Sequence, residues 1–262
     1  MKLRSLFSAA SIGLTLLLPV GSEAGAAELR VLSALATRTV MADIGPMFER
    51  ATGHNLEITY ATLGAGIKRV SGGETFDVVI MPGMPGFLKK SAAAADNVTA
   101  IARSGIGVAV RKGAAKPDIS SPEALRGALL AAKSITYANP AGGGAAGVHF
   151  AKVLERLGIA DEMQSKTVFH PKADATGILV ANGEAEIGVN QIQVLMPVAG
   201  IEIVGPLPGD LQNNIVFSAA VMSGNSNAEA SKALADFLRT PEAAAVMKAK
   251  GLEPASNTGE RL

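Results

Sequence analysis

Residues 76–81 read Phe-Asp-Val-Val-Ile-Met, an apolar run broken by a single aspartate. A short run without polar alternation is typical of a strand whose two faces are both covered, as in a parallel sheet with helices on each side. Two more strands are predicted upstream, at residues 28–32 and 56–60, and each is followed by a small-residue loop and a helix. Repeated strand, loop and helix units predict an α/β fold built on doubly wound sheets.

The remainder of the chain repeats this order of segments. Apolar strands are predicted at residues 106–110, 134–137, 167–169, 187–189 and 215–221. Apolar residues at helical spacing predict helices at residues 123–132, 147–157, 229–238 and 241–250. In a doubly wound sheet, ligands bind in the crevice at the carboxyl ends of the strands. The loops that follow the strands are therefore the first place to search for a site.

The first 26 residues predict a secretory signal peptide. Lys2 and Arg4 give a positive start, an apolar run covers residues 6–20, and small residues follow, with cleavage expected after Ala24 or Ala26. The apolar run is shorter than the ~20 residues that a membrane-spanning helix needs. We therefore expect a periplasmic protein, exported by a cleaved signal peptide, with no stable membrane insertion.

The composition excludes several classes of function. Removing Lys2, Arg4 and Glu23 with the signal peptide from the 24 basic and 23 acidic residues leaves 22 of each sign. A balanced chain has no long-range field that attracts nucleic acid or an anionic membrane. The chain has no cysteine, which excludes thiolate metal sites and a cysteine nucleophile. It has no tryptophan and two tyrosines, too few to build a platform on which bases stack.

Several short motifs occur in an order that resembles a known family. They are SALATR at residues 33–38, FERATG at 48–53, ATLG at 61–64, TFDVVI at 75–80, FAKVLERLG at 150–158 and LVANGEAEIG at 179–188. In this order they resemble the molybdate-binding receptors of ABC transporters over nearly the whole mature chain. The resemblance implies the α/β type II periplasmic binding-protein fold, in which two doubly wound lobes are joined by two crossover strands. It implies a first lobe of residues 27–107 and 216–262 and a second lobe of residues 108–215.

Three positions depart from the molybdate receptors. By alignment, the two serines whose hydroxyl groups donate to the oxyanion in that family correspond to Ala36 and Leu63, and the binding-site tyrosine corresponds to Gln191. Neither Ala36 nor Leu63 can donate through its side chain, and each lost charge-assisted hydrogen bond costs about 1.5–3 kcal/mol. The departures argue against molybdate as the ligand.

Four loops before predicted helices are candidate anion sites, because the backbone N–H groups at a helix N-terminus attract negative charge. They span residues 37–39, 61–66, 142–147 and 172–177. The candidate substrate-binding residues in or beside the loops and at the strand ends are Thr37, Arg38, Thr39, Thr62, Gly64, Lys68, Asn139, Gly143, Gly144, Asn190 and Gln191. Arg38 is the strongest candidate, because a guanidinium grips a carboxylate with two hydrogen bonds, although a solvated residue at a helix start has the same pattern.

Two histidines are candidate catalytic residues. His149 lies in the first turn of the helix after the glycine-rich loop, and His170 lies at the end of the strand predicted at 167–169. Imidazole titrates near neutral pH, so either histidine can bind a ligand or move a proton. His54 follows a helix end and is interpreted as structural. The sequence contains no metal-ligand cluster, phosphate loop or Ser/His/Asp order, so we expect no metal and no cofactor.

The sequence leaves an enzyme and a receptor open. The chain resembles periplasmic aconitate isomerases of the same fold, which interconvert trans- and cis-aconitate without a cofactor. This resemblance implies an isomerase that acts by base-mediated allylic proton transfer. The alternative is an ABC-transporter solute-binding protein for a carboxylate or other oxyanion, with a permease as its partner, and an orphan receptor used for sensing has the same motifs. In each case the expected ligand is a small tricarboxylate or dicarboxylate anion.

Overall fold

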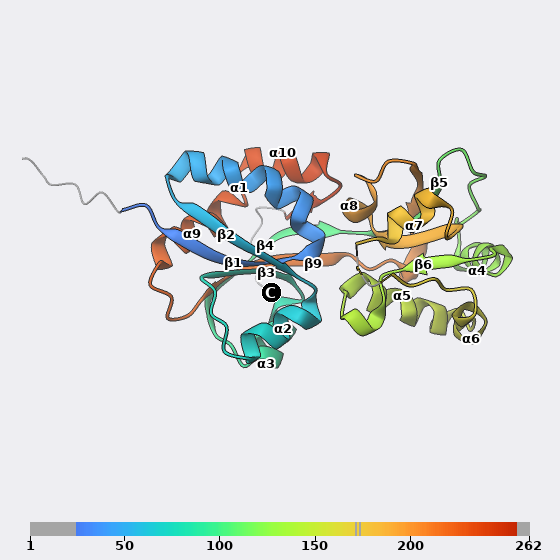
Figure 1. Cartoon of the computed structure of the whole chain (residues 1–262), viewed down its shortest axis with the longest axis horizontal. Coiled ribbons are helices and arrows are strands. Elements are labelled where there is room, and N and C mark those ends of the chain that lie inside the picture. Colours follow the sequence, from blue (N-terminus) through green and yellow to red (C-terminus); the bar gives the residue numbers. More distant parts are fainter. Residues whose placement is uncertain (1–24, 171, 173, 256–262) are drawn as a thin grey trace, which may run out of the picture.

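Two β-sheets, one in each of two lobes, organise the chain, and the lobes lie one after the other along the long axis (Figure 1). The structure is a computed structural model that describes residues 25–170, 172 and 174–255. Residues 1–24, which hold most of the predicted signal peptide, lie outside the described residues. None of the helices in these described ranges has the length and apolar character that a bilayer crossing requires.

The first lobe contains a six-stranded sheet in the order β10-β4-β9-β3-β1-β2. Its strands are β1 (Glu28–Ala34), β2 (Asn55–Ala61), β3 (Val78–Pro82), β4 (Ala95–Ser104), β9 (Ile215–Met222) and β10 (Glu253–Pro254). β1 pairs in parallel with β2 and with β3, whereas β9 is antiparallel to β3 on one side and to β4 on the other. The carboxyl ends of β1, β2 and β3 therefore meet at one edge of the sheet.

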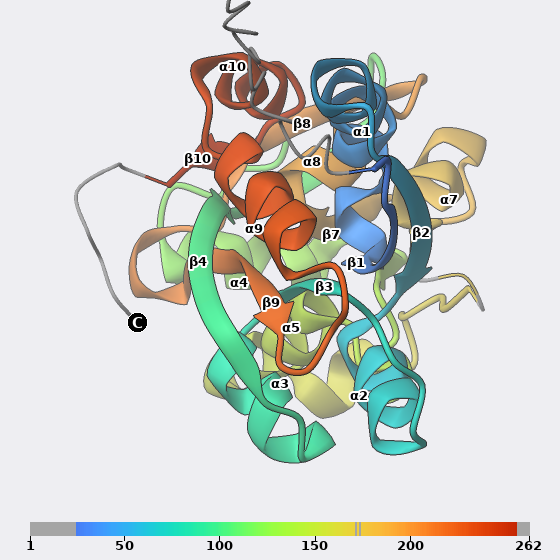
Figure 2. The ribbon, with the colours of Figure 1, turned by 90° about the vertical axis from the view of Figure 1, so that its left-hand side faces the viewer.

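Helices cover both faces of this sheet. They are the 3₁₀ helix η1 (Leu35–Thr37) and the α-helices α1 (Arg38–Thr52), α2 (Leu63–Ser71), α3 (Met84–Ser91), α9 (Ala228–Phe237) and α10 (Pro241–Ala249). α1 and α10 lie on one face, and α2 and α3 lie on the other (Figures 1 and 2). α1 buries Val40, Ile44 and Phe48 at helical spacing, and it ends at Gly53, whose φ of 76° suits a left-handed C-cap.

The second lobe contains a four-stranded sheet in the order β6-β7-β5-β8. Its strands are β5 (Ile106–Arg111), β6 (Ile135–Tyr137), β7 (Ile187–Gln191) and β8 (Ile201–Pro206). Its helices are α4 (Pro122–Ala131), η2 (Pro140–Gly142), α5 (Ala145–Arg156), α6 (Ala160–Gln164), α7 (Thr176–Asn182), α8 (Ile192–Leu195) and η3 (Gly209–Leu211). β6 is parallel to β7, and β5 is antiparallel to both of its neighbours.

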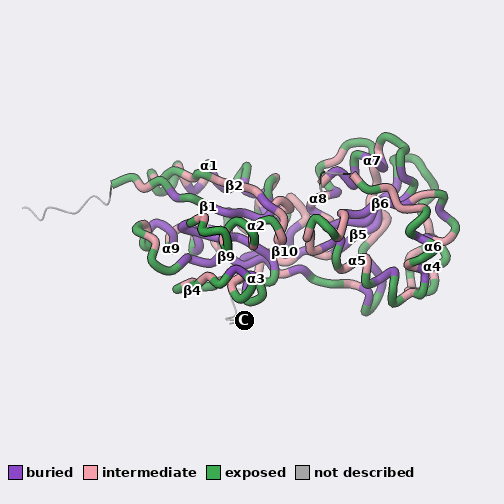
Figure 3. Tube along the Cα trace, turned by 60° about the horizontal axis from the view of Figure 1, so that its bottom comes forward, coloured by how far each residue is buried: buried purple, intermediate pink, exposed green. Residues whose placement is uncertain are grey.

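The apolar runs of the sequence form the interiors of both lobes. All five residues of β3 are buried, as expected from the run at residues 76–81. Phe48 and Phe217 in the first lobe and Phe150 in the second are fully buried. Figure 3 shows the buried strands inside each lobe and exposed chain at its outer surface. Each lobe thus has enough buried apolar surface to be held together without disulfide bonds.

Two short segments carry the chain between the lobes. β4 passes into β5 through Gly105, and residues 207–214 lead back from β8 to β9. The side chain of Gln212 joins the two segments, because its Oε1 accepts a hydrogen bond from the Ile106 N–H at 2.9 Å and its Nε2 donates to the Ile106 carbonyl at 3.0 Å. The hydroxyl of Ser104 also donates to Oε1 of Gln193 on α8. The two crossing segments are therefore bonded to each other rather than being independent linkers.

The predicted strand at residues 167–169 is wrong. Thr167 alone pairs with a neighbour, in an isolated parallel bridge to Ile135. β6 has three residues and offers little edge for pairing. Phe169 instead packs edge-on against the ring of Tyr137, with 5.0 Å between the ring centroids. The segment that leads to His170 is consequently a loop, and the structure adds β4, β8 and α3, which the sequence did not predict.

Candidate functional site

A cleft with about 480 Å³ of empty space lies between the two lobes. The first lobe contributes the loops after β1, β2 and β3, and the second contributes the loops before α5 and α7 and the end of β7. The lining residues are Ala34, Leu35, Ala36, Ala61, Thr62, Leu63, Pro82, Ala138, Gly144, Ala145, Ala146, Asp174, Asn190, Gln191, Val194 and Phe217. Most of them are small or apolar. A ligand in the cleft therefore meets few polar side chains, and backbone groups carry much of the polar character.

Two helices begin at the cleft. α2 follows Thr62, whose hydroxyl oxygen caps the helix by accepting a hydrogen bond from the Ala65 N–H at 3.3 Å. α5 follows Gly144, which has no side chain to cap the helix. Gly144, Ala145 and Ala146 all line the cleft, so the first turn of α5 borders it directly. The N-terminus of a helix carries a partial positive charge and N–H groups without helical partners, which favours an anion at this position.

The two lobes touch at one side of the cleft. The Thr62 hydroxyl donates a hydrogen bond to the Gly142 carbonyl at 2.7 Å, and the Gly64 N–H donates to the Gly143 carbonyl at 3.4 Å. The approach requires glycine at position 143, because a Cβ there would stand 2.9 Å from Cα of Gly64. A Cβ on Gly64 would make a tight contact of 3.3 Å with Cα of Gly143. Gly143 also has a φ of +70°, which disfavours any residue with a side chain. The structure is thus a closed arrangement of the lobes.

An ion pair links the lobes at a second position. Nη1 of Arg38, the first residue of α1, lies 3.2 Å from Oδ2 of Asp174, which lines the cleft. The guanidinium also lies over the ring of Tyr60, 5.4 Å from its centroid. Burial raises the pKa of the Tyr60 hydroxyl, and the positive charge of Arg38 partly offsets this shift. Arg38 is therefore fixed by one contact from each lobe at the edge of the cleft.

Two amide side chains lie where β7 ends. Asn190 and Gln191 are both 4% exposed and both line the cleft. Nδ2 of Asn190 donates to the Thr176 hydroxyl at 3.0 Å, and its Oδ1 accepts from the Gln191 N–H at 2.8 Å. These bonds fix the position of Asn190. Within the described part of the chain, no residue hydrogen-bonds to the side-chain amide of Gln191, which leaves this amide available to a ligand.

The structure brings some of the predicted binding residues together and separates others. Thr62, Gly144, Asn190 and Gln191 line the cleft, and Gly64 and Gly143 form the contact that closes it. Arg38 is not among the lining residues, although it pairs with Asp174, which is one of them. The remaining candidates Thr37, Thr39, Lys68 and Asn139 are not among the lining residues either.

The side chains of these remaining candidates have other surroundings. The Thr37 hydroxyl is buried and donates to the Ala34 carbonyl at 2.7 Å, and Oδ1 of Asn139 accepts a hydrogen bond from the Ala141 N–H at 2.9 Å. Thr39 is half-buried in the first turn of α1, and Lys68 is exposed on α2. The side chains of Thr37 and Asn139 therefore stabilise the loops that form the cleft wall.

Neither candidate catalytic histidine lines the cleft. Nε2 of His149 lies 2.8 Å from the Leu211 carbonyl in the segment that returns to β9. Nδ1 of His170 accepts a hydrogen bond from the Lys172 N–H at 3.0 Å within its own loop. His54 accepts a hydrogen bond from the Ala27 N–H at 3.1 Å, which joins the starts of two strands. The geometry gives each described histidine a partner outside the cleft.

Sequence reasoning missed Asp174. It lies in the predicted anion loop at residues 172–177, but a carboxylate was not weighed as a residue of an anion site. The signal that could have found it is its position two residues before α7, where a side chain at the helix start faces the same edge as the other loops. Asp174 and Arg38 are 136 residues apart in sequence, so their pairing could not be inferred from spacing.

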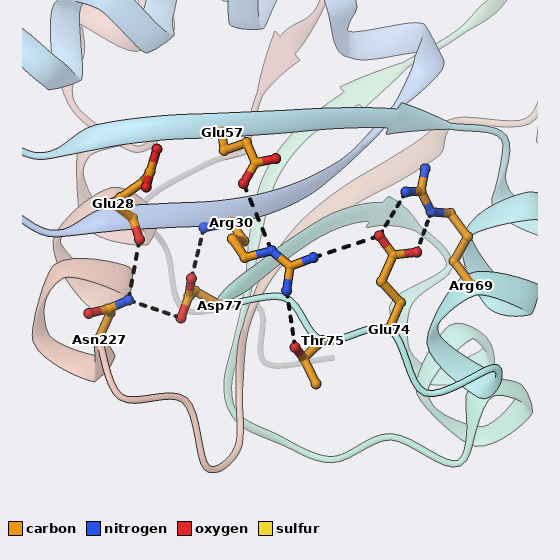
Figure 4. A network of polar contacts seen from close by, with 8 residues as sticks. All are labelled: Glu28, Arg30, Glu57, Arg69, Glu74, Thr75, Asp77 and Asn227. Atoms are coloured by element: carbon orange, nitrogen blue, oxygen red, sulfur yellow. Dashed lines mark hydrogen bonds and ion pairs between the residues drawn. The ribbon is translucent and has the colours of Figure 1, made fainter.

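The opposite end of the first lobe carries a second hollow, beside a polar network that we call the amino-end cluster. The cluster consists of Glu28, Arg30, Glu57, Arg69, Glu74, Thr75, Asp77 and Asn227, and all of these except Arg69 line the hollow (Figure 4). Nε and Nη2 of Arg69 donate to Glu74 at 2.6 and 2.7 Å, and Arg30 lies 3.8 Å from Glu74 and 3.9 Å from Glu57.

Polar groups in the amino-end cluster largely neutralise one another. Oδ2 of Asp77 accepts from the Arg30 N–H at 2.7 Å, and its Oδ1 accepts from Nδ2 of Asn227 at 3.3 Å. In the described residues, no group of three or more His, Cys, Asp or Glu side chains is arranged to hold a metal ion. The interlobe cleft is therefore the better candidate for a functional site.

A family model for bacterial extracellular solute-binding proteins matches residues 29–253, which include both lobes. The chain belongs to this family. This solute-binding protein is 33% identical over 234 residues to the aconitate isomerase of a Pseudomonas species, covering 86% of its own chain and 87% of that protein. It is 30% identical over 242 residues to the molybdate-binding protein ModA of Azotobacter vinelandii, covering 87% and 90%.

A solved structure confirms the fold of this solute-binding protein. The periplasmic molybdate-binding protein of Azotobacter vinelandii superposes with a TM-score of 0.68 at 20% identity, over 87% of this chain and 100% of that one. The type II periplasmic binding-protein fold predicted from the sequence is thus confirmed, with two doubly wound lobes and two crossings. Ala36 and Leu63, the two positions predicted to correspond to the oxyanion serines, both line the cleft.

Proposed function

We propose that this protein is an isomerase that interconverts trans-aconitate and cis-aconitate in the interlobe cleft. The observation that carries the proposal is the combination of 33% identity to an aconitate isomerase with a cleft lined by Ala36 and Leu63, whose side chains carry no hydroxyl. A small tetrahedral oxyanion requires a dense shell of donors, and its affinity falls when hydroxyl donors are lost. A larger, flat tricarboxylate can reach donors that lie farther apart.

The cleft supplies suitable partners for a tricarboxylate. The first turn of α5 offers N–H groups with the favourable end of the helix dipole, and the Gln191 amide offers a further donor. Arg38 at the edge can form two parallel hydrogen bonds with a carboxylate. The apolar residues Leu63, Val194 and Phe217 suit the carbon skeleton.

The proposed reaction needs no cofactor. A base removes a proton from the methylene carbon of aconitate, and the negative charge spreads through the adjacent double bond into a carboxylate. A proton then returns to the far carbon of this allylic system. Donors placed where the charge develops lower the barrier, and the first turn of α5 and Gln191 are positioned for that role. We also propose that the protein works in the periplasm, which the extracellular solute-binding family and the charged and apolar start of the chain support.

The test uses the chain that starts at Ala27, incubated with trans-aconitate alone and followed by proton NMR. The expected result is the formation of many molecules of cis-aconitate per molecule of protein, until a constant ratio of the isomers is reached from either direction. A rise in melting temperature with trans-aconitate but without product would refute the isomerase and leave a binding protein.

A second candidate function is a receptor that delivers a carboxylate to an ABC permease. The relation to ModA and the closed two-lobed arrangement favour it, because a receptor needs only binding and closure. The receptor and the enzyme share the cleft and the same donors, so turnover is what separates them. In both cases we expect molybdate to leave the melting temperature unchanged, since Ala36 and Leu63 offer no hydroxyl.

A further inference from the structure

We infer that Asp174 is the catalytic residue that moves the proton in the cleft, and that Arg38 holds its carboxylate until a carboxylate of the substrate displaces it. The inference deepens the isomerase proposed above and rests on it. It assigns the proton transfer to a group that sequence reasoning missed, in place of His149 and His170.

The composition of the cleft leads to Asp174. Among the described residues that line it, Asp174 is the one ionisable side chain, and the others are apolar residues, one glycine, one threonine and two amides. A neutral hydroxyl or amide is a very weak base, whereas an ionised carboxylate can accept a proton. Removing a proton from carbon requires a base within reach of that carbon. His149 and His170 do not line the cleft. The hydrogen bonds of their imidazole rings, to Leu211 and from Lys172, lie outside it.

The ion pair with Arg38 explains how a carboxylate can be present in an anion site. The pair joins α1 of the first lobe to the loop before α7 of the second, with 3.2 Å between Nη1 and Oδ2. The two side chains are 53% and 36% exposed, and a pair with this exposure contributes little to stability. A carboxylate of the substrate can therefore replace Asp174 as the partner of the Arg38 guanidinium at a small cost in free energy. Asp174 then loses its partner when the substrate arrives, and its oxygens become free to accept a proton.

The transfer balances with one carboxylate acting as both base and acid. An Asp174 oxygen takes a proton from the methylene carbon, and the C–H electron pair forms a double bond to the central carbon. The electron pair of the former double bond moves toward its outer carbon and into the carboxylate there. Asp174 then returns the proton to that outer carbon, which restores the charge of the substrate and of the enzyme. Because the two outer carbons of aconitate carry the same groups, the shift changes only the geometry of the double bond.

Three variants separate this role from that of a latch between the lobes. Asp174→Asn removes the base and the ion pair, Arg38→Gln removes the ion pair but keeps the base, and Asp236→Asn changes an exposed aspartate on α9 as a matched control. The measurements are kcat and KM, the Kd for trans-aconitate by calorimetry, and the exchange of the substrate's methylene protons in D₂O by NMR.

We expect Asp174→Asn to lower kcat at least ~100-fold and to stop the exchange, the loss typical of removing a general base. Its Kd for trans-aconitate should not rise, because a negative charge near a trianion has been removed. Arg38→Gln should raise KM about 10-fold or more, from the loss of a bidentate carboxylate contact, and should keep exchange at saturating substrate. Asp236→Asn should have the same kcat, KM, Kd and proton exchange as the unchanged protein.

Two results would overturn the inference in different ways. If Asp174→Asn retains more than about a tenth of kcat, or matches Arg38→Gln in every measurement, Asp174 is a latch and the isomerase uses another base. If the unchanged protein forms no cis-aconitate, the isomerase proposal itself fails and Asp174 loses its catalytic role with it. The second result shows in the unchanged protein, so the two failures are distinguishable.

Discussion

The amino-end cluster and the cleft lie at opposite ends of the same parallel strands, β1, β2 and β3. At the amino ends, charged side chains pair with one another, as Arg69 does with Glu74 and Arg30 with Glu57 (Figure 4). At the carboxyl ends, the lining residues are small or apolar, and the polar groups include helix N–H groups and one amide without a described partner. The dense cluster of charges at the amino ends is therefore interpreted as structural. The carboxyl ends, which have fewer charged side chains, form the candidate site.

The difference follows from how polar groups are satisfied. Exposed ion pairs add little to stability, and in the amino-end cluster the charged groups already have partners. Backbone N–H groups at the start of a helix remain without helical partners and attract an anion. Substitutions at the cleft should therefore change ligand affinity, whereas matched substitutions at the other end should change stability alone.

The largest effect is expected from the glycine contact across the cleft. In Gly143→Ala the new Cβ would stand 2.9 Å from Cα of Gly64, so the lobes cannot close fully. Overpacking of this kind costs about 1–3 kcal/mol, which weakens the affinity for trans-aconitate by about 10- to 100-fold in a calorimetric titration.

Gly73→Ala is the matched control for this contact. Gly73 borders the amino-end cluster, has a φ of +92° and has open space where its Cβ would lie. The variant should lose about 1–2 kcal/mol of stability from the left-handed conformation, with unchanged affinity. Equal affinities for Gly143→Ala and the unchanged protein would contradict the closed arrangement as the binding state.

A smaller effect is expected from Thr62→Val. The change removes the hydrogen bond to the Gly142 carbonyl and the cap of α2 while keeping the side-chain shape. Because the Gly142 bond exists only when the lobes touch, the affinity for trans-aconitate should fall about 2- to 10-fold. Loss of the cap should lower the free energy of unfolding by about 1 kcal/mol, which lowers the melting temperature by about 2–4 °C.

Ser121→Ala removes a similar cap far from the cleft and serves as the control. The Ser121 hydroxyl oxygen accepts a hydrogen bond from the Ala124 N–H at 3.1 Å at the start of α4. This variant should show a similar fall in melting temperature and no change in affinity. A loss of affinity in both variants would mean that general stability, rather than the contact across the cleft, controls binding.

The smallest effect is expected from Glu74→Gln in the amino-end cluster. The hydrogen bond from Arg69, with the charge of Arg30 adding to it, lowers the pKa of the Glu74 carboxyl below its ordinary value of 4.5. A carboxyl whose pKa is lowered in the folded state stabilises the protein at pH values above the ordinary pKa. This stabilisation is lost as the pH falls through the lowered pKa.

Melting curves of Glu74→Gln and the unchanged protein test this sign. The variant should melt slightly lower near neutral pH, and the two curves should converge in acid below the ordinary pKa of 4.5. Ligand affinity should be equal at neutral pH. A difference that grows as the pH falls would show that the ion pair does not act as the structure implies.

The fold was largely predictable because its central strands are short apolar runs. The run at residues 76–81 predicted β3, and the motif order identified the family that the comparison confirmed. β4 escaped prediction because its first half is largely exposed and polar, and its place in the sheet depends on pairing with β9, more than a hundred residues later. None of the residues of β8 is fully buried, and its sequence, IEIVGP, has no long apolar run that predicts a strand.

The candidate site was predictable as a set of loops but not as a set of side chains. The loops before α2, α5 and α7 do meet at the cleft. The sequence could not tell that His149 contacts the Leu211 carbonyl, because this contact depends on how the second lobe packs. It could not tell that Asp174 meets Arg38, because this contact depends on how the two lobes meet. Side-chain direction in a loop is a tertiary property, and residue type alone does not predict it.

The place of β9 in the first sheet has a consequence for the order of folding. β9 lies between β3 and β4, although the whole second lobe separates it from them in sequence. The second lobe is one continuous stretch from β5 to β8, so its contacts can form as soon as that stretch is available. The first lobe must keep a place open between β3 and β4 until β9 arrives. The sheet that carries half of the cleft is therefore completed last, when nearly the whole chain has been made.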